Sequence, residues 1–267
     1  MKREPAVAYQ FYPGDPATLK ETLDRLIPAA TAKQKALAVV SPHAGYIYSG
    51  SVAGETFAAV EIPRDILVMG PNHHGYGASV ALMEKGAWDM PLGEVAINTV
   101  LARHLLAQTE IIETDTLAHR FEHSLEVQVP FLQYFRPDLT LTPLVISHLS
   151  FKSCQIVGEA IAAAIEQYGK PVLIVASSDM THYESRESAT TKDALALKQL
   201  MAMDPQALYN TVLGKKISMC GIMPATIALI AALRLGASQA RLIRYTDSGE
   251  ASGDINQVVG YAGVVIS

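Results

Sequence analysis

Three histidine-bearing segments have the residue types and spacing of a metal or acid–base site. His43 follows an apolar, β-branched run, the pair His73 and His74 follows a second such run, and His182 follows a third. Imidazole is the commonest ligand for zinc, copper and iron, and imidazoles on separate loops can surround one ion without a local motif. A single histidine is more often a hydrogen-bonded structural residue, so the metal hypothesis depends on the repeated placement.

Cys220 is a further candidate ligand. It precedes a segment of helical pattern, in which Pro224 suits the first turn. A helix N-terminus lowers the pKa of a nearby thiol by stabilising the thiolate, so we expect either a metal ligand or a reactive thiol. A buried small hydrophobe is an equally good interpretation, and it is the one that we prefer for Cys154.

Two polar clusters add candidates for catalysis and binding. Asp179 and His182 stand three residues apart, close enough for the carboxylate to orient the imidazole in general acid–base catalysis, although an aspartate here also caps loops. Glu122, His123 and Glu126 precede an apolar helical segment and equally resemble ordinary helix-start residues. Three other histidines are expected to face solvent without a function: His104, His119 and His148.

Several familiar sites are excluded by spacing. The sequence has no paired C-x-x-C motif and no EF-hand, and its glycine-rich sections have neither Rossmann nor P-loop spacing. It also lacks the G-x-S-x-G motif of α/β-hydrolases. No nucleotide cofactor is therefore expected.

Composition predicts one compact domain that spans residues 1–267. Hydrophobic residues make up 49% of the chain and charged residues 18%, and no linker-like stretch interrupts it. The net charge of −5, without a basic run, argues against nucleic acid as a partner. The N-terminus lacks an apolar signal region and the longest apolar stretch is short, so we expect no membrane association, a cytoplasmic location and two reduced cysteines.

Apolar β-branched runs alternate with segments of helical period, which predicts a three-layer α/β/α fold with a mixed, mostly buried central sheet. The expected strands are 36–40, 66–69, 78–83, 140–146, 172–176, 241–245 and 258–266. The expected helices are 50–60, 97–106, 123–134 (interrupted by Pro130), 153–167, 189–201, 205–213 and 224–235. In open α/β sheets ligands bind beyond the carboxyl ends of the strands, and the histidines follow three of these ends.

Taken together, five motifs resemble those of the Memo family, also called AmmeMemoRadiSam system protein B in microbes. Their order and spacing match along nearly the whole chain. They are Pro42-His43-Ala44-Gly45-Tyr46, Gly70-Pro71-Asn72-His73-His74, Glu122-His123-Ser124-Leu125-Glu126, Ser177-Ser178-Asp179-Met180-Thr181-His182 and Cys220-Gly221.

The resemblance implies a fold similar to that of class III extradiol non-haem iron dioxygenases. It implies His43, His73 and Cys220 as metal ligands, with Asp179 and His182 beside them as catalytic residues. His74, Glu122 and His123 are then the predicted substrate-binding residues. A thiolate in place of the dioxygenase carboxylate favours copper or zinc and argues against ring cleavage. The family name also implies a functional link to a radical-SAM protein and an AMMECR-type protein.

Three functions follow as hypotheses. The first is a metal-dependent redox protein, an oxidoreductase that holds iron or copper and uses His182, oriented by Asp179, to move a proton. The alternative is a non-catalytic module that binds a small molecule or peptide in the same cleft. A zinc-dependent hydrolase with His182 as its base is the third.

Overall fold

The computed structural model describes residues 2–29 and 32–267. Within these ranges the chain forms a mixed α/β fold around a sheet of twelve strands, as the sequence predicts. The main path of the sheet has the order β1-β5-β6-β8-β3-β9-β2-β12-β10, while β11 pairs with β12, and β4 pairs with β7 and β8. The strands are β1 (Lys2–Arg3), β2 (Ala38–Ser41), β3 (Asp65–Pro71), β4 (Val80–Leu82), β5 (Ala87–Trp88), β6 (Val95–Ile97), β7 (Glu113–Thr114), β8 (Thr140–Ile146), β9 (Val172–Ser177), β10 (His182–Glu184), β11 (Ala240–Asp247) and β12 (Val258–Ile266).

The centre of the sheet is parallel. β3 pairs in parallel with β8 and β9, and β9 pairs in parallel with β2. All residues of β2, β3 and β9 are buried, which explains why these strands are continuous apolar runs rather than alternating ones. The carboxyl ends of β2, β3 and β9 therefore meet at one edge.

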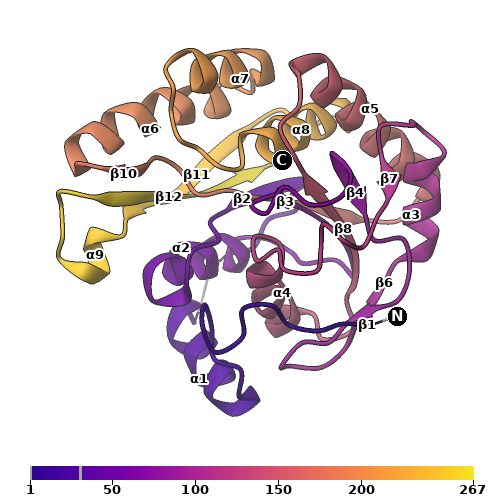
Figure 1. The fold of residues 1–267 in the computed structure, drawn as a ribbon, viewed down its shortest axis with the longest axis horizontal. Coiled ribbons are helices and arrows are strands. Elements are labelled where there is room, and N and C mark those ends of the chain that lie inside the picture. Colours follow the sequence, from indigo (N-terminus) through magenta and orange to yellow (C-terminus); the bar gives the residue numbers. More distant parts are fainter. Residues whose placement is uncertain (1, 30–31) are drawn as a thin grey trace.

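Helices cover both faces of this sheet (Figure 1). They are α1 (Pro16–Leu26), α2 (Tyr46–Ala58), α3 (Thr99–Leu106), α4 (Val129–Phe135), α5 (Phe151–Tyr168), α6 (Arg186–Met201), α7 (Pro205–Gly214), α8 (Ile222–Arg234) and α9 (Gly249–Ser252), with a 3-10 turn η1 (Glu126–Gln128) before α4. Helices α1, α2 and α4 lie on one side, and α3, α5, α6, α7 and α8 lie on the other (Figure 1).

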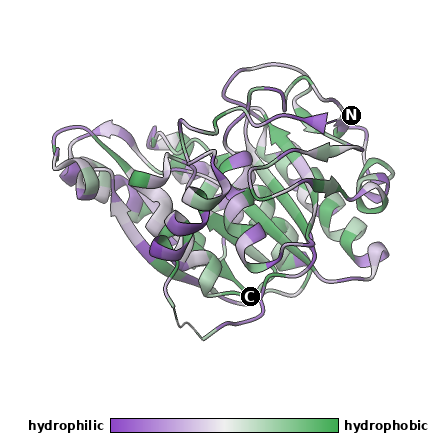
Figure 2. Ribbon diagram, turned by 90° about the horizontal axis from the view of Figure 1, so that it is seen from below, coloured by the Kyte–Doolittle hydropathy of each residue, from purple (hydrophilic) through white to green (hydrophobic). Residues whose placement is uncertain are grey.

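Alternate side chains of β3 enter two separate cores. Ile66 and Val68 pack in the cluster that contains residues of α1, α2 and α4. Leu67 and Met69 pack in the cluster that contains residues of α5 and α8. This alternation follows from the pleat of the strand, and the apolar colouring of the central strands in Figure 2 agrees with it. The predicted three-layer architecture is confirmed.

Most predicted elements are found, with boundary shifts of a few residues. Helix α1 was not predicted; its N-cap is Asp15, whose side chain accepts a hydrogen bond from the Thr18 amide. The helix predicted over 123–134 is wrong at its start, because 126–128 form a 3-10 turn and Pro130 lies in the first turn of α4 rather than interrupting it. Among the described residues, no helix is both long and apolar enough to cross a membrane.

Candidate metal centre

Three neighbouring parallel strands deliver the central residues of the site. His43 lies two residues beyond the end of β2, His73 two residues beyond β3, and Asp179 two residues beyond β9. The strands are hydrogen-bonded in the order β3-β9-β2, so these loops converge at the carboxyl edge. The placement inferred from the sequence is the one observed.

Three histidines form a compact cluster at this edge. One ligand atom from each of His43, His73 and His123 lies within 4.8 Å of the other two. The ring centroids are 5.3 Å apart for His43 and His73, 5.5 Å for His43 and His123, and 4.5 Å for His73 and His123. His43 is buried, His123 is partly buried and His73 is exposed. This group could hold a metal ion that remains accessible from solvent.

The tautomer of His43 follows from its hydrogen-bond partners. The hydroxyl of Ser177 donates to the carbonyl of Ser124 at 2.6 Å and accepts from Nε2 of Gln128 at 2.8 Å. Because that hydroxyl has one proton, Nδ1 of His43, 2.9 Å from Oγ, must be the donor in their contact. The lone pair of His43 is therefore on Nε2, the nitrogen that faces Cys220 at 3.2 Å.

Glu122 orients the other two imidazoles. Its carboxylate accepts from the amide of His73 at 2.7 Å and from Nδ1 of the same residue at 2.8 Å, and lies 3.5 Å from Nδ1 of His123. These contacts leave Nε2 of each ring for a ligand, as the outer-sphere carboxylates of metal sites do. Burial raises the pKa of Glu122, but the hydrogen bonds and charge of His73 bring its net pKa below the ordinary value.

Burial keeps two of the three imidazoles, those of His43 and His123, neutral. The pKa of His43 lies well below its usual value, first because the side chain is buried and then because of His123 and His73 nearby. Burial also lowers the pKa of His123 to about 4. Metal ligation requires an unprotonated ring nitrogen, so these two rings have the protonation state of metal ligands at neutral pH.

Cys220 lies against this cluster. Its Sγ is 3.2 Å from Nε2 of His43 and accepts a hydrogen bond from the amide of Asp179 at 3.3 Å. The expected lowering of its pKa by a helix N-terminus is wrong: burial, and then the charge of Asp179, raise the pKa of this thiol. Gly221 is required next to it, since a Cβ there would lie 2.3 Å from the Ser177 carbonyl oxygen.

Asp179 and His182 both lie at this edge but are held by different partners. Oδ1 of Asp179 accepts from the His43 amide at 2.7 Å, and burial raises the pKa of this carboxyl to about 6. His182 donates from Nδ1 to the carbonyl of Ser218 at 2.8 Å, which leaves its Nε2 as an acceptor. Ser218, rather than Asp179 as expected, therefore fixes the His182 ring.

The remaining candidates lie around the cluster. His74 is exposed, bonds through Nε2 to the carbonyl of Phe121 at 2.9 Å, and stacks on Tyr76. Glu122 is buried, with its carboxylate occupied by His73. The expectation that His119 faces solvent is wrong, because it is 1% exposed and bonded to the Ala81 carbonyl.

Sequence reasoning did not group His123 with His43 and His73. The loop that carries it has no regular structure ahead of η1, so no periodicity predicts where the ring points. The hydrogen bonds at Nδ1 of His43 and at Nδ1 of His73 join residues 134 and 49 positions apart, and no local motif encodes them.

Comparison with known proteins identifies the family of this chain. The family model described as Memo-like protein matches residues 3–265. A MEMO1 family protein of Methanothermobacter thermautotrophicus is 37% identical over 98% of this chain and 99% of its own length, and one of Methanosarcina mazei is 38% identical over 99% and 98%.

A solved structure of an uncharacterized protein from Escherichia coli K12 has a similar fold. It superposes with a TM-score of 0.59 at 16% identity and covers 85% of this chain and 98% of its own. Since the family model and the relatives both extend over nearly the full chain, this protein belongs to the Memo family.

Proposed function

We propose that this protein is a metal-dependent redox protein that holds iron or copper through His43, His73 and Cys220. The observation that carries the proposal is the convergence of three imidazoles within 4.8 Å, beside the Cys220 thiol. Nitrogen and sulfur donors suit copper, iron and zinc better than magnesium or calcium. Bound iron or copper would supply one-electron chemistry at this edge of the sheet.

His123 is a competing ligand to Cys220. It belongs to the three-histidine group, whereas Cys220 approaches His43 alone at 3.2 Å. The buried thiol needs a nearby cation to lose its proton. Cys220 would therefore become a thiolate, the form that ligates a metal, only when the metal ion binds. Comparison of His123→Ala with Cys220→Ala distinguishes the two donors.

His182 is the proposed proton carrier. Its Nδ1–H bonds to the Ser218 carbonyl, so Nε2 is the nitrogen that would accept a proton if His182 acts as a general base. Asp179 has a pKa of about 6, because of burial, and can exchange a proton near neutral pH at the site. The substrate would be an accessible small molecule or peptide segment at the exposed His73 side.

A binding module is the second candidate function. Large exposed side chains neighbour the site in the sequence: Tyr48, Tyr76, Phe121 and Tyr183 are each at least 42% exposed. Exposed aromatic groups around a polar centre are typical of surfaces that hold a ligand. This function needs no redox-active metal.

Spectroscopy of copper-loaded protein tests the redox proposal. We expect an electron paramagnetic resonance signal that disappears on anaerobic reduction and returns in air, and a sulfur-to-copper absorption band that Cys220→Ala removes but the control Cys154→Ala retains. Zinc retention with ester hydrolysis and no redox cycle would favour the hydrolase instead. If His43→Ala keeps both the paramagnetic resonance signal and the sulfur-to-copper band, the proposed site is wrong.

A further inference from the structure

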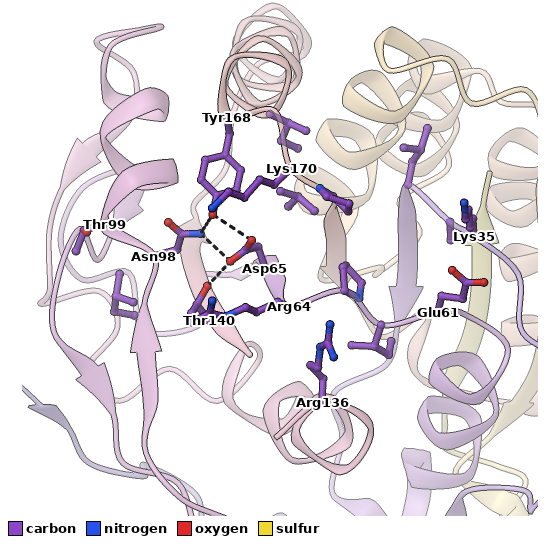
Figure 3. Close-up of a pocket in the computed structure, with 18 residues that line it drawn as sticks. Lys35, Glu61, Arg64, Asp65, Asn98, Thr99, Arg136, Thr140, Tyr168 and Lys170 are labelled. Atoms are coloured by element: carbon purple, nitrogen blue, oxygen red, sulfur yellow. Dashed lines mark hydrogen bonds between the residues drawn. The ribbon is translucent and has the colours of Figure 1, made fainter. Parts of the chain in front are cut away.

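A cavity lined by both charged and apolar residues lies at the opposite edge of the sheet. It has a volume of about 910 Å³ and lies at the amino ends of β2, β3, β8 and β9 (Figure 3). Asp65 begins β3 at this cavity and Pro71 ends β3 near the histidines, so the two sites are about 20 Å apart at 3.3 Å per residue. Groups in this cavity cannot contact a substrate at the histidine cluster.

The wall of the cavity next to α5 is a closed hydrogen-bond network. The carboxylate of Asp65 accepts from Thr140 Oγ1 at 2.7 Å, Asn98 Nδ2 at 3.0 Å and the Tyr168 hydroxyl at 3.0 Å (Figure 3). Asp65 is buried, and all three donors are neutral. Because its oxygens are already occupied, this carboxylate is a poor cation site and instead stiffens the wall.

Four permanent cations surround the cavity: Lys35, Arg64, Arg136 and Lys170. Among the residues that the structure describes, only Arg136 has a carboxylate at ion-pair distance, 3.5 Å from Asp138, and that pair is largely solvent-exposed. The buried Nε of Arg136 makes no hydrogen bond in the described part of the chain. Figure 3 shows Arg136 projecting into the open centre and Lys170 reaching beside Tyr168.

The charge of the lining is opposite to that of the whole protein. Four cations face two carboxylates, Asp65 and Glu61, so the lining carries +2 while the chain carries −5. Apolar side chains complete the walls, among them Ile62, Pro63 and Pro171. An anion with an apolar part matches both properties.

We propose that this cavity binds an organic phosphate, with the phosphate held by cations of the lining such as Arg136 and Lys170, and the apolar part against Ile62, Pro63 and Pro171. A guanidinium and an ammonium together give the forked donor and the point charge that phosphate sites commonly use. The volume lies in the range of small-molecule sites.

Calorimetry with phenyl phosphate tests this site. We expect wild-type protein to bind it, and Arg136→Gln or Lys170→Gln to weaken binding about tenfold each, the cost of losing one charged hydrogen bond. Lys198→Gln, which removes an exposed cation on α6, is the matched control and should bind as wild type does. His43→Ala should also bind normally, which separates this result from any failure of the proposed metal function.

Two further probes define the chemistry. Inorganic phosphate should bind more weakly than phenyl phosphate, and phenol should bind more weakly than either. Equal affinity for inorganic phosphate and phenyl phosphate would show that the apolar wall does not contribute to binding, and would overturn the proposal of an organic phosphate. No binding of phenyl phosphate at millimolar concentration, or equal binding by the Arg136→Gln/Lys170→Gln double variant with an unchanged melting temperature, would overturn the site.

Discussion

β3 and β9 run from a cationic cavity at their amino ends to a histidine cluster at their carboxyl ends. At the carboxyl edge the polar groups are imidazoles that burial keeps neutral, such as His43 and His123. At the amino edge they are cations such as the half-buried Arg136 and the exposed Lys170.

The two edges therefore suit different ligands. Neutral nitrogen donors with fixed tautomers favour a metal ion, whereas permanent cations beside apolar walls favour an anion. The difference also predicts that acid affects one edge and leaves the other unchanged.

Acid sensitivity of stability should come from buried histidines on the carboxyl-edge loops. Burial, and then the charge of Arg3, lower the pKa of His119 from 6.5 to about 4. The unfolded chain takes up this proton as the pH falls below 6.5, while the folded state resists until about pH 4, so stability is lost over this range. By about pH 4, His119 should have reduced the free energy of unfolding by roughly 3 kcal/mol.

Urea unfolding of wild type and His119→Gln at pH 7 and pH 4 measures this contribution. Between pH 7 and pH 4, the free energy of unfolding of His119→Gln should fall by roughly 3 kcal/mol less than that of wild type. The exposed control His148→Gln should match wild type. An identical loss in wild type and His119→Gln would show that this buried imidazole does not control the acid response.

Glu122→Gln should weaken metal binding without removing a ligand. The amide keeps the volume but loses the charge that orients His73 and His123, and loss of an outer-sphere partner of this kind typically costs about 10- to 100-fold in affinity. Competition with a chelating dye measures the change. Asp65→Asn, an equivalent substitution at the amino edge, should leave metal affinity unchanged, and a comparable loss there would break the contrast between the edges.

Asp65→Asn should instead destabilise the fold. One acceptor of the network becomes a donor that faces Thr140, Asn98 or Tyr168, which costs about 1 to 2 kcal/mol. Thermal or urea unfolding checks this value. Wild-type stability in this variant would mean that the network does not stiffen the cavity wall.

The sequence was sufficient for most of the long elements and for the edge that carries the site, but not for α1 or for the short strands β1, β5, β6, β7 and β10. Buried strands such as β8 and β12 are continuous apolar runs, and their predicted bounds match the structure. The loop positions of His43 and His73 then follow from the topology of parallel strands.

Finer features of the site depend on tertiary contacts that local pattern does not encode. The fixed tautomer of His43 requires Ser177, Ser124 and Gln128 to meet. The raised pKa of Cys220 reflects burial, which outweighs the helix N-terminus that the sequence suggested. The burial of His119 likewise comes from packing near Arg3 and Trp88, far away in the chain.

Elemental analysis of protein purified without chelator or affinity-tag metal tests the central claim most directly. Near-stoichiometric iron or copper in wild type, lost in His43→Ala and Cys220→Ala but retained in the exposed-histidine control His148→Ala, is the predicted result. Absence of bound metal together with no uptake at micromolar concentration, or equal metal in all four proteins, would contradict a metal centre at the carboxyl edge.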